Sequence, residues 1–505
     1  MIDTAKLKEK ILDLAIRGKL VPQDPNDEPA SVLLEKIRAE KLQMVKEGKL
    51  KQKDIKDDTV IFVGEDNLHY EKFGDGSIKC IEDEIPFDIP KSWAWTRLGN
   101  IFQHNTGKAL NSSNSQGDFY SYITTSNVYW DKLDLRNVKK MLFTKEELDK
   151  YTLKKNDLLV CEGGDIGRAT IWDKDYEIRF QNHIHRLRPF LNLSIKFYYY
   201  VFYLYKHTGL IGGNGIGIQT LSSNKLDAIL LPITTLNEQY KIVESIESNI
   251  GYINNLEIDK KDLLESINSL KSKILELAIR GKLVPQDPND EPADVLLERI
   301  RKEKEELIKQ GKIKRDKKET IIFKGDDNSY YEKIVNSSIC IDDELPFEKP
   351  ENWAYVRLED IVSYEQPTPY IVTSTNYSKK YKTPVLTAGK SFIIGYTNED
   401  FGIRKKLPAI IFDDFTTDLR LIDFPFKVKS SAMKILSVDE DLMSYDYAYY
   451  TMKCVDCDHY NHKRYWISDF SKKIITLPPK DEQERILKRI NDVFKFLELI
   501  EKSLS

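Results

Sequence analysis

Apolar residues recur at steps of four and three along the middle of the chain, from residue 242 to residue 277. This spacing predicts one long amphipathic helix over residues 235–283, packed along a single apolar seam. Gly281 is expected to end the helix, and Pro285 and Pro288 prevent its continuation. Lys260 interrupts the seam. The apolar residues of the seam are Ile242, Ile246, Ile250, Ile253, Leu256, Leu263, Ile267, Leu270, Ile274 and Leu277.

Three stretches of sequence occur twice, at offsets of about 260 and 244 residues. Residues 7–30 and 270–293 match at 22 of 24 positions, and both contain GKLVPQDPNDEPA. The stretch DEIPFDIPKSWAWTRLGNI returns as DELPFEKPENWAYVRLEDI, and a Leu-Pro…Glu-Gln pattern also returns. These periods are far too long for a solenoid, so they indicate a duplicated half-protein. The second repeat pairs residues 83–101 with residues 343–361, and the third pairs residues 231–239 with residues 477–483.

Both ends of the chain carry the same helical spacing as the middle. By the repeats, residues 486–504 copy the first part of the central helix and residues 7–14 copy its second part. Together the two ends would form one interrupted helix. We expect this helix to run antiparallel to the central one, under a pseudo-twofold axis. The alternative is two independent amphipathic helices, each docked on its own domain.

The fold class expected is α+β, with two mixed α/β domains separated by two long antiparallel helices in a circular arrangement. Short strand-like runs such as DLLVCEGG and KLPAIIFDD alternate with turn signals in the two globular parts. The run FYYYVFYLY is expected to be core rather than a base-stacking platform. The expected segments are a helical segment with linker at 1–58, a globular segment at 92–235, a helical segment at 236–319, a globular segment at 352–480 and a terminal helix at 481–505.

Composition is that of a soluble protein without membrane spans. The 505 residues are 31% charged, and no run approaches 18 apolar residues. Five scattered cysteines suit a reducing cytoplasm. The net charge of −4 is unevenly spread. Residues 93–235 hold 18 Lys and Arg against 13 Asp and Glu, and residues 353–478 hold 17 against 16. The repeated segments are therefore acidic and favour protein partners, whereas the globular segments favour a phosphate backbone.

The sequence predicts no catalytic residue and no metal site. A phosphate-binding loop is not found: Thr387–Ser391 ends in Gly-Lys-Ser, but Pro384 stands where the first glycine belongs. The adenine-methyltransferase signature is also missing. Cys454, Cys457, His459 and His462 have side chains that suit zinc, yet all four fall within nine residues, so ordinary core and surface roles are preferred.

The order of the segments and their local motifs resemble one family over the whole chain. The motifs are LAIRGKLVPQDPNDEPA, the W-A-[WY]-x-R-L stretch at each globular start and the L-P…E-Q stretch at each globular end. Within the globular parts, NDLLVCEGGDIGRATIWD, FQNHIHRLRPF and TPVLTAGKSFIIGYTNE add to the likeness. The sequence looks like a DNA-specificity subunit of a type I restriction–modification system.

This resemblance implies a non-catalytic DNA-binding subunit. Each globular domain would read one half of a bipartite double-stranded site. The helices would set the spacer and dock two copies of a methyltransferase subunit, with two restriction (translocase) subunits as further partners. S-adenosylmethionine, ATP and magnesium would belong to those partners, and the chain itself would need no cofactor. The alternatives are a specificity subunit of a stand-alone or type II-like methyltransferase, and a scaffold that binds protein rather than DNA.

Candidate DNA-contacting residues are polar or basic side chains in loops, which can address base edges or phosphates. They are Asn111, Ser112, Thr125, Asn127, Arg168, Gln181, Asn182, His183, Arg186, Asn214, Lys390, Ser391, Lys405, Thr416, Thr417, Lys463 and Arg464. The candidate docking residues lie in the duplicated helices and loops. They are Ile11, Leu14, Arg17, Leu20, Ile274, Leu277, Arg280 and Leu283.

Overall fold

The computed structural model divides into two compact units, residues 2–259 and residues 260–505. It describes residues 3–110, 116–211, 221–314, 320–334, 337–388, 391–457 and 464–504. The boundary between the units falls inside helix α7 (Leu236–Ile279), which is continuous over 44 residues. The predicted long helix is therefore confirmed, and it ends shortly before Gly281 as expected. In the described residues, no helix is long and apolar enough to cross a bilayer.

The first unit begins with elements that recur in the second. Helix α1 (Thr4–Ile16) leads through a loop to α2 (Ala30–Lys46), and a small antiparallel sheet β1-β2-β3 follows. Strand β4 (Ala94–Arg97) enters the globular part and pairs antiparallel with β15 (Leu230–Ile233), which leaves it. The strands of the small sheet are Val60–Val63, His69–Lys72 and Ile78–Cys80.

The first variable domain, residues 98–229, is built on two four-stranded sheets. One has the order β12-β11-β14-β5 and the other β10-β13-β6-β9, with β13 parallel to β6. The aromatic helix α5 (Ile195–His207) packs beneath the first sheet, with Phe197, Tyr198 and Phe202 fully buried. The core prediction for this run is thus confirmed. The remaining bounds are α3 Leu98–Ile101, β5 Phe102–Thr106, β6 Asp118–Ile123, β7 Val128–Tyr129, β8 Lys132–Leu133, β9 Lys139–Phe143, α4 Lys145–Tyr151, β10 Thr152–Leu153, β11 Leu158–Cys161, β12 Ala169–Ile171, β13 Ile178–Phe180, β14 Ile184–Pro189 and α6 Ser223–Asp227.

The second unit repeats the surrounding elements but not the domain between them. Helix α8 (Ala293–Lys309) and the sheet β16-β17-β18 correspond to α2 and β1-β2-β3, and β19 pairs with β27 as β4 pairs with β15. The second variable domain, residues 358–473, has a four-stranded sheet β20-β26-β23-β24 and a three-stranded sheet β22-β21-β25. The bounds are β16 Thr320–Lys324, β17 Tyr330–Ile334, β18 Ser337–Cys340, β19 Ala354–Arg357, α9 Leu358–Ile361, β20 Val362–Glu365, β21 Thr383–Leu386, β22 Ile393–Thr397, β23 Ala409–Asp413, β24 Leu419–Ile422, β25 Lys427–Val428, β26 Met433–Val438, α10 Tyr445–Lys453, α11 Tyr465–Ser468, β27 Ile474–Leu477 and α12 Lys480–Leu504.

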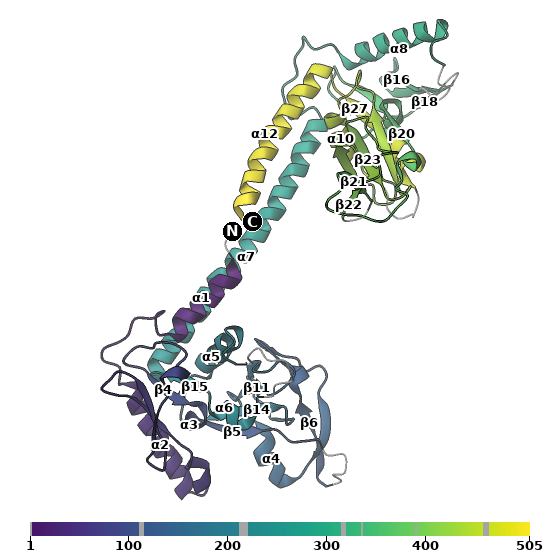
Figure 1. Cartoon of the computed structure of the whole chain (residues 1–505). Coiled ribbons are helices and arrows are strands. Elements are labelled where there is room, and N and C mark those ends of the chain that lie inside the picture. Colours follow the sequence, from purple (N-terminus) through teal and green to yellow (C-terminus); the bar gives the residue numbers. More distant parts are fainter. Residues whose placement is uncertain are drawn as a thin grey trace. The chain divides into compact units, whose positions relative to one another are not determined.

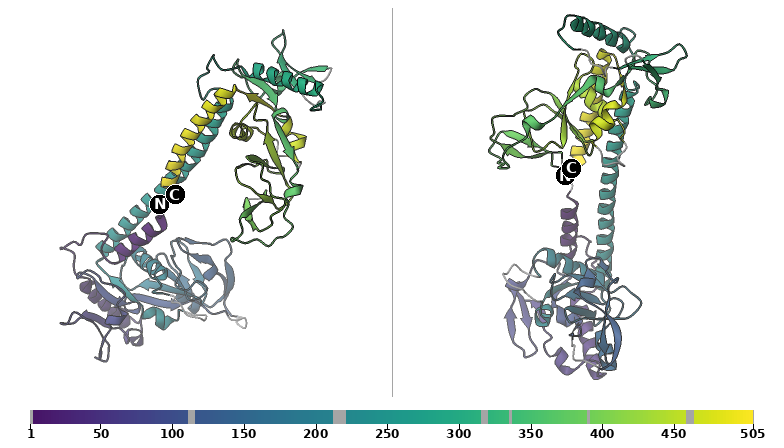
Figure 2. Two further views of the ribbon diagram at one scale, coloured as in Figure 1. Left: turned by 45° about the horizontal axis from the view of Figure 1, so that its top comes forward. Right: turned by 90° about the vertical axis from the view of Figure 1, so that its right-hand side faces the viewer.

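Helices pair antiparallel in each unit. In the first, Lys8 of α1 lies 3.5 Å from Glu257 near the middle of α7, and Gln23 after α1 reaches Glu238 at the start of α7. In the second, Lys271 of α7 lies 2.9 Å from Glu501 near the end of α12. Both views in Figure 2 show α12 beside α7, and Figure 1 labels all three helices. The α+β class and the antiparallel helices are therefore confirmed.

We call the elements that occur in both units the frame. It consists of α1, α2, β1–β4, β15 and the first part of α7 in the first unit, and of the last part of α7, α8, β16–β19, β27 and α12 in the second. One apolar core in each unit joins the frame to its variable domain. In the first unit Ile16, Trp95, Phe202 and Ile242 belong to the same cluster. Each variable domain is therefore packed firmly on its own copy of the frame.

Candidate nucleic-acid interface and docking elements

Three loops of the first variable domain meet at one place. The Gln181 backbone N–H donates to the Ile123 carbonyl at 3.0 Å, and the Glu162 N–H donates to the His183 carbonyl at 2.9 Å. Arg168 Nη2 donates to the Thr125 carbonyl at 2.7 Å. The structure thereby brings together five of the candidate residues, which are Thr125, Arg168, Gln181, Asn182 and His183.

Charge and exposure differ among these candidates. The Arg168 guanidinium stands over the Tyr129 ring, 5.1 Å from its centroid, and lies 3.9 Å from an Asp165 carboxylate oxygen. The His183 side chain is 55% exposed and lies 3.5 Å from Glu162. Arg168 is thus a positioned cation whose side chain is 17% exposed, whereas His183 faces solvent.

Two candidates are buried in the first variable domain. Asn127 is 3% exposed, and its amide donates to the Asp134 carbonyl at 2.7 Å. Arg186 is 2% exposed and donates to the Lys150 and Thr152 carbonyls. Burial lowers the pKa of Arg186 to about 10. In this structure both side chains support the loops and are not presented to a ligand. Asn111, Ser112 and Asn214 lie outside the described residues.

The candidate turn of the second variable domain is held by two carboxylates. Asp413 accepts hydrogen bonds from the Phe415 N–H at 2.9 Å and from the Thr416 hydroxyl at 2.7 Å. Thr417 adopts a positive φ of 60° in this turn. Asp414 is fully buried, pairs with Lys434 at 3.2 Å and accepts from the Trp466 N–H at 3.0 Å.

Asp414 therefore connects the turn to the start of α11, so Thr416, Thr417 and Arg464 come from neighbouring segments. Thr416 and Arg464 are exposed, as are Ser391 and Lys405 elsewhere on this domain. Lys390 and Lys463 lie outside the described residues.

A buried ion pair fixes another loop of this domain. Lys427 is fully buried and lies 2.7 Å from Glu399, and Glu399 also accepts from the backbone N–H groups of Thr373 and Ser374. Burial acts to raise the pKa of Glu399, but the hydrogen bonds from Lys427 and these groups lower it to about 2. The carboxylate is therefore charged, and it anchors the loop that precedes β21.

No group of three or more His, Cys, Asp or Glu side chains is placed to hold a metal ion in the parts of the chain that the structure describes. Cys457 instead donates to an Asp469 carboxylate oxygen at 3.4 Å. His459 and His462 lie outside the described residues.

A buried carboxylate holds the duplicated loop in each unit. Glu238 accepts from the Trp93 indole N–H at 3.0 Å and from the Gln23 amide at 2.6 Å. The second unit repeats this with Glu482, Trp353 and Gln286, at 3.0 and 2.7 Å. The repeat motifs that begin and end each variable domain are thus explained: their Trp and Glu meet across β4–β15 and β19–β27, and they clamp the loop.

The predicted docking residues are mostly packed against their own unit. Ile11 and Ile274 are 8% and 6% exposed, and the four leucines Leu14, Leu20, Leu277 and Leu283 are half-buried. Arg17 and Arg280 stack over Phe87 and Phe347, at 4.8 and 4.9 Å from the ring centroids. The exposed apolar side chains of these helices are others, including Leu7 and its repeat partner Leu270.

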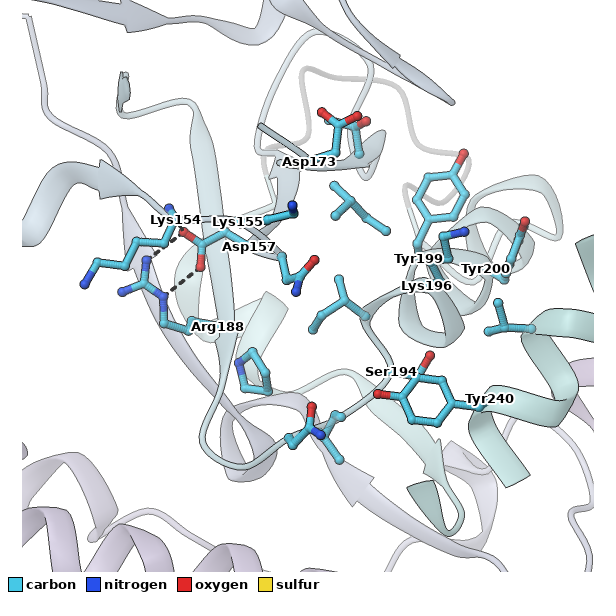
Figure 3. A pocket seen from close by; sticks show the side chains of 18 of the residues that line it. Lys154, Lys155, Asp157, Asp173, Arg188, Ser194, Lys196, Tyr199, Tyr200 and Tyr240 are labelled. Atoms are coloured by element: carbon cyan, nitrogen blue, oxygen red, sulfur yellow. Dashed lines mark hydrogen bonds and ion pairs between the residues drawn. The ribbon is translucent and has the colours of Figure 1, made fainter. Parts of the chain in front are cut away.

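A cavity of the first unit lies where the variable domain meets α7, with a volume of about 1100 Å³ (Figure 3). Arg188 binds Asp157 through two hydrogen bonds of 2.7 Å on one side, and Tyr199, Tyr200 and Tyr240 line the other. Its basic side chains largely face carboxylates, as in the pairs Arg188–Asp157, Lys155–Asp175, Lys174–Asp173 and Lys196–Glu247. This pairing makes the cavity a poor phosphate site and a structural junction instead.

Comparison with known proteins adds a family to this geometry. The family model described as type I restriction modification DNA specificity domain matches residues 90–269 and 350–505. The EcoAI specificity subunit of Escherichia coli is 30% identical over 71% of this chain and 62% of its own length. The EcoR124I/EcoR124II specificity subunit of the same organism is 44% identical over 28% of this chain and 37% of its own length.

Among solved structures, an HsdS subunit from Thermoanaerobacter tengcongensis aligns over 83% of this chain and 93% of its own, with 12% identity and a TM-score of 0.47. The chain spans about 62% of the length of the first curated relatives it matches. The two matched ranges each begin at the tryptophan-bearing start of a variable domain and run into the helix that follows it. They cover well over half of the chain, which therefore belongs to the type I restriction modification DNA specificity family.

Proposed function

We propose that this protein is the sequence-specific DNA-binding subunit of a type I restriction–modification complex. The observation that carries the proposal is the coincidence of the family match with the two unlike domains, each set on a like frame. Reading two different half-sites requires two different surfaces. Docking two copies of one partner requires the same surface twice.

Each variable domain would read one half of a bipartite duplex site. In the first domain, we assign this role to the loops that carry Thr125, Arg168, Gln181, Asn182 and His183, with Asn111, Ser112 and Asn214 as further contacts. In the second, we assign it to Ser391, Lys405, Thr416, Thr417 and Arg464, with Lys390 and Lys463. Arg168 and Lys405 are suited to phosphate or guanine contacts. Asn127 and Arg186 would position the loops from within.

The helices would set the spacing between the half-sites. A helix of 44 residues extends about 66 Å at 1.5 Å per residue, which is long compared with one turn of duplex. The segments 1–58, 236–319 and 481–505 would dock two methyltransferase subunits, and two restriction subunits would join through them. The chain itself would be non-catalytic and cytoplasmic. Methyl transfer to adenine, S-adenosylmethionine, ATP and magnesium would belong to the partners.

The test is methylome sequencing in a host that lacks DNA methylation. The host would express this chain with the methyltransferase encoded beside it in its source genome. One bipartite methyladenine motif is expected, and it should disappear when this chain is omitted. Exchange of residues 92–235 should change one half of the motif and leave the other half and the spacer unchanged. A motif that persists without this chain would refute the proposal and favour a protein-binding scaffold.

Single-residue variants sharpen this test. Arg168→Ala should weaken binding of the cognate duplex and reduce its dependence on salt concentration, because a cation is removed from the interface. Arg136→Ala is a suitable control, since Arg136 is 86% exposed on the same domain but pairs only locally with Asp134. A stand-alone or type II-like system is the second candidate. It would give the same motif in the absence of any restriction subunit.

A further inference from the structure

The small three-stranded sheet of the frame occurs twice and lies outside the ranges that the family model matches. Its two copies, β1-β2-β3 and β16-β17-β18, have the same strand order and register. We call them the first and second small sheet. Side chains alternate between the two faces of each strand, so each sheet has one face toward its unit and one toward solvent.

The inner face is fastened to the frame by a buried ion pair. Glu71 of the first small sheet is 3% exposed and binds Arg97 of β4 through hydrogen bonds of 3.0 and 2.6 Å. Glu332 and Arg357 form the same pair in the second unit, at 2.9 and 2.7 Å. Because the inner face is fixed in this way, the outer face points away from the frame in both units.

The outer face carries a row of one phenylalanine, one tyrosine and one cysteine across the three strands. Phe62 pairs with Tyr70, and Tyr70 pairs with Cys80. The second small sheet repeats the row as Phe323, Tyr331 and Cys340. Phe62 and Phe323 are 39% and 40% exposed, and both cysteines are exposed free thiols.

The aromatic rings of this row are held rigidly. Phe62 stacks on Tyr70 at 5.9 Å between centroids, and the Tyr70 hydroxyl donates to Asp66 at 2.7 Å. A Cβ at Gly64 would lie 2.8 Å from the Tyr70 ring, so glycine is needed for the ring to lie there. The second sheet has the same stack at 6.0 Å and the same hydroxyl bond at 2.7 Å. Rings fixed in advance lose little entropy on binding, which is a property of recognition surfaces.

The two sheets resemble each other more on the solvent face than on the inner face. The six outer positions are Val60, Phe62, Tyr70, Lys72, Ile78 and Cys80 in one copy, and Ile321, Phe323, Tyr331, Lys333, Ser338 and Cys340 in the other. Four of these six pairs are identical. Of the five inner pairs, only Ile61 with Ile322 and Glu71 with Glu332 are identical. Packing usually constrains the residues of the inner face more than those of the outer face. The stronger match on the outer face therefore indicates a constraint from a partner outside the chain.

The charge of the surroundings favours protein over DNA as the ligand. Residues 60–84 hold seven acidic and two basic side chains, and residues 320–344 hold six and two. Such a surface repels a phosphate backbone and suits a basic rim around an apolar patch. Matching surfaces in the two units suit two copies of the same partner.

We infer that the outer face of each small sheet docks one copy of the methyltransferase subunit, through an apolar patch on that subunit with a basic rim. The inference rests on the proposed function and adds a contact surface to the helices and loops assigned above. The duplicated loop and the small sheet are both attached to β4, because Ala30 at the end of the loop donates to the Ser92 carbonyl beside β4, and Arg97 of β4 binds Glu71.

The experiment uses the full chain co-expressed with its methyltransferase, with stoichiometry and affinity measured by native mass spectrometry and sedimentation. Phe62→Ser and Cys80→Lys each alter the first small sheet alone. Each is expected to weaken one of the two methyltransferase copies by about tenfold or more, giving a one-to-one complex where the wild type gives two-to-one. Phe323→Ser and Cys340→Lys should do the same for the other copy.

Val63→Lys is the matched control. Val63 is 56% exposed on the opposite face of the same strand, and the second sheet has Lys324 at that position. It should leave both copies bound. Two copies bound with wild-type affinity by the Phe62→Ser and Cys80→Lys variants would overturn the inference. Failure of the proposed function would be seen separately, as a wild-type chain that yields no bipartite motif.

Discussion

Glu332→Gln should loosen the second small sheet and leave the first one unchanged. In the wild type, the Arg357 guanidinium donates two parallel hydrogen bonds to Glu332, and the two side chains are 12% and 7% exposed. The amide that replaces the carboxylate keeps one acceptor oxygen but turns an NH2 group toward the other guanidinium N–H. One charge-assisted bond is lost, which typically costs about 1.5–3 kcal/mol.

The loss is limited because Arg357 keeps its bonds to Glu344 and to the Lys472 carbonyl, each 2.7 Å long. A cost of about 1.5–3 kcal/mol corresponds to a roughly 10- to 150-fold larger opening constant for the sheet. Hydrogen–deuterium exchange of peptides from residues 320–340 measures this directly, since local opening exposes their amides. Peptides from residues 60–80 serve as the internal control, and Glu71→Gln should give the reverse pattern.

Acid should have the same effect as the substitution in the wild type. The hydrogen bonds from Arg357 lower the pKa of Glu332, against the effect of burial. A carboxyl with a lowered pKa stabilises the fold above its unfolded value of 4.5 and loses that contribution as the pH falls through the folded value. An exchange rate that changes less than threefold on Glu332→Gln would refute the view that this pair anchors the second small sheet. Equal changes in the exchange rates of both small sheets would refute it as well.

Three further predictions concern the stability of each unit. Gly281→Ala places a Cβ 2.4 Å from a Pro350 carbon at a φ of +66°, so it should lower the stability of the second unit by about 2–4 kcal/mol. Gly311→Ala has a similar φ of +68° but open space around the Cβ, so it should cost only about 1 kcal/mol. Chemical denaturation of the two variants measures the difference. Burial lowers the pKa of His185 from 6.5 to about 4, so between these pH values only the unfolded chain takes up the proton. The first unit should therefore lose up to about 3 kcal/mol of stability as the pH falls from 6.5 to 4, and His185→Gln should abolish this loss in pH-dependent denaturation. Equal acid sensitivity of the wild type and the variant would contradict the prediction. Glu482→Ala leaves the buried Trp353 indole N–H without its acceptor and removes the bond from the Gln286 amide. It should cost about 1–3 kcal/mol, seen as earlier unfolding of the second unit by tryptophan fluorescence. An unchanged transition would show that Glu482 does not hold the loop.

The architecture could be predicted from the sequence because internal repeats and helical periodicity determine it. The period of three and four predicted α7 and its antiparallel partners, and the offset near 260 predicted the duplication. The seam was only partly right, since Ile242 and Ile274 are buried while Leu256 and Leu270 are exposed. A helical period identifies one face but does not show how far a partner helix extends along it.

The small sheets and the inward role of Arg186 could not be predicted in this way. The sheet strands are three to five residues long and interrupted by Gly-Asp and Asp-Asn turns, so they resemble exposed linkers. One signal in the sequence did point to the small sheets: Phe62, Tyr70 and Glu71 recur with the same spacing as Phe323, Tyr331 and Glu332. Arg186 is an arginine in a polar context, and only its neighbours in space, the Lys150 and Thr152 carbonyls, show that it serves the fold.

The duplication offers a way to sort side chains by what they do. Pairs that are alike and buried, such as Glu238 with Glu482, hold the frame together, because the same fold must be built twice. Pairs that are alike and exposed, such as Phe62 with Phe323, have no reason to match except a shared partner. Exposed side chains such as His183, in domains whose strand orders differ, have no counterpart in the other unit. Under the proposed function, joining two copies of one enzyme to two different half-sites would require all three kinds.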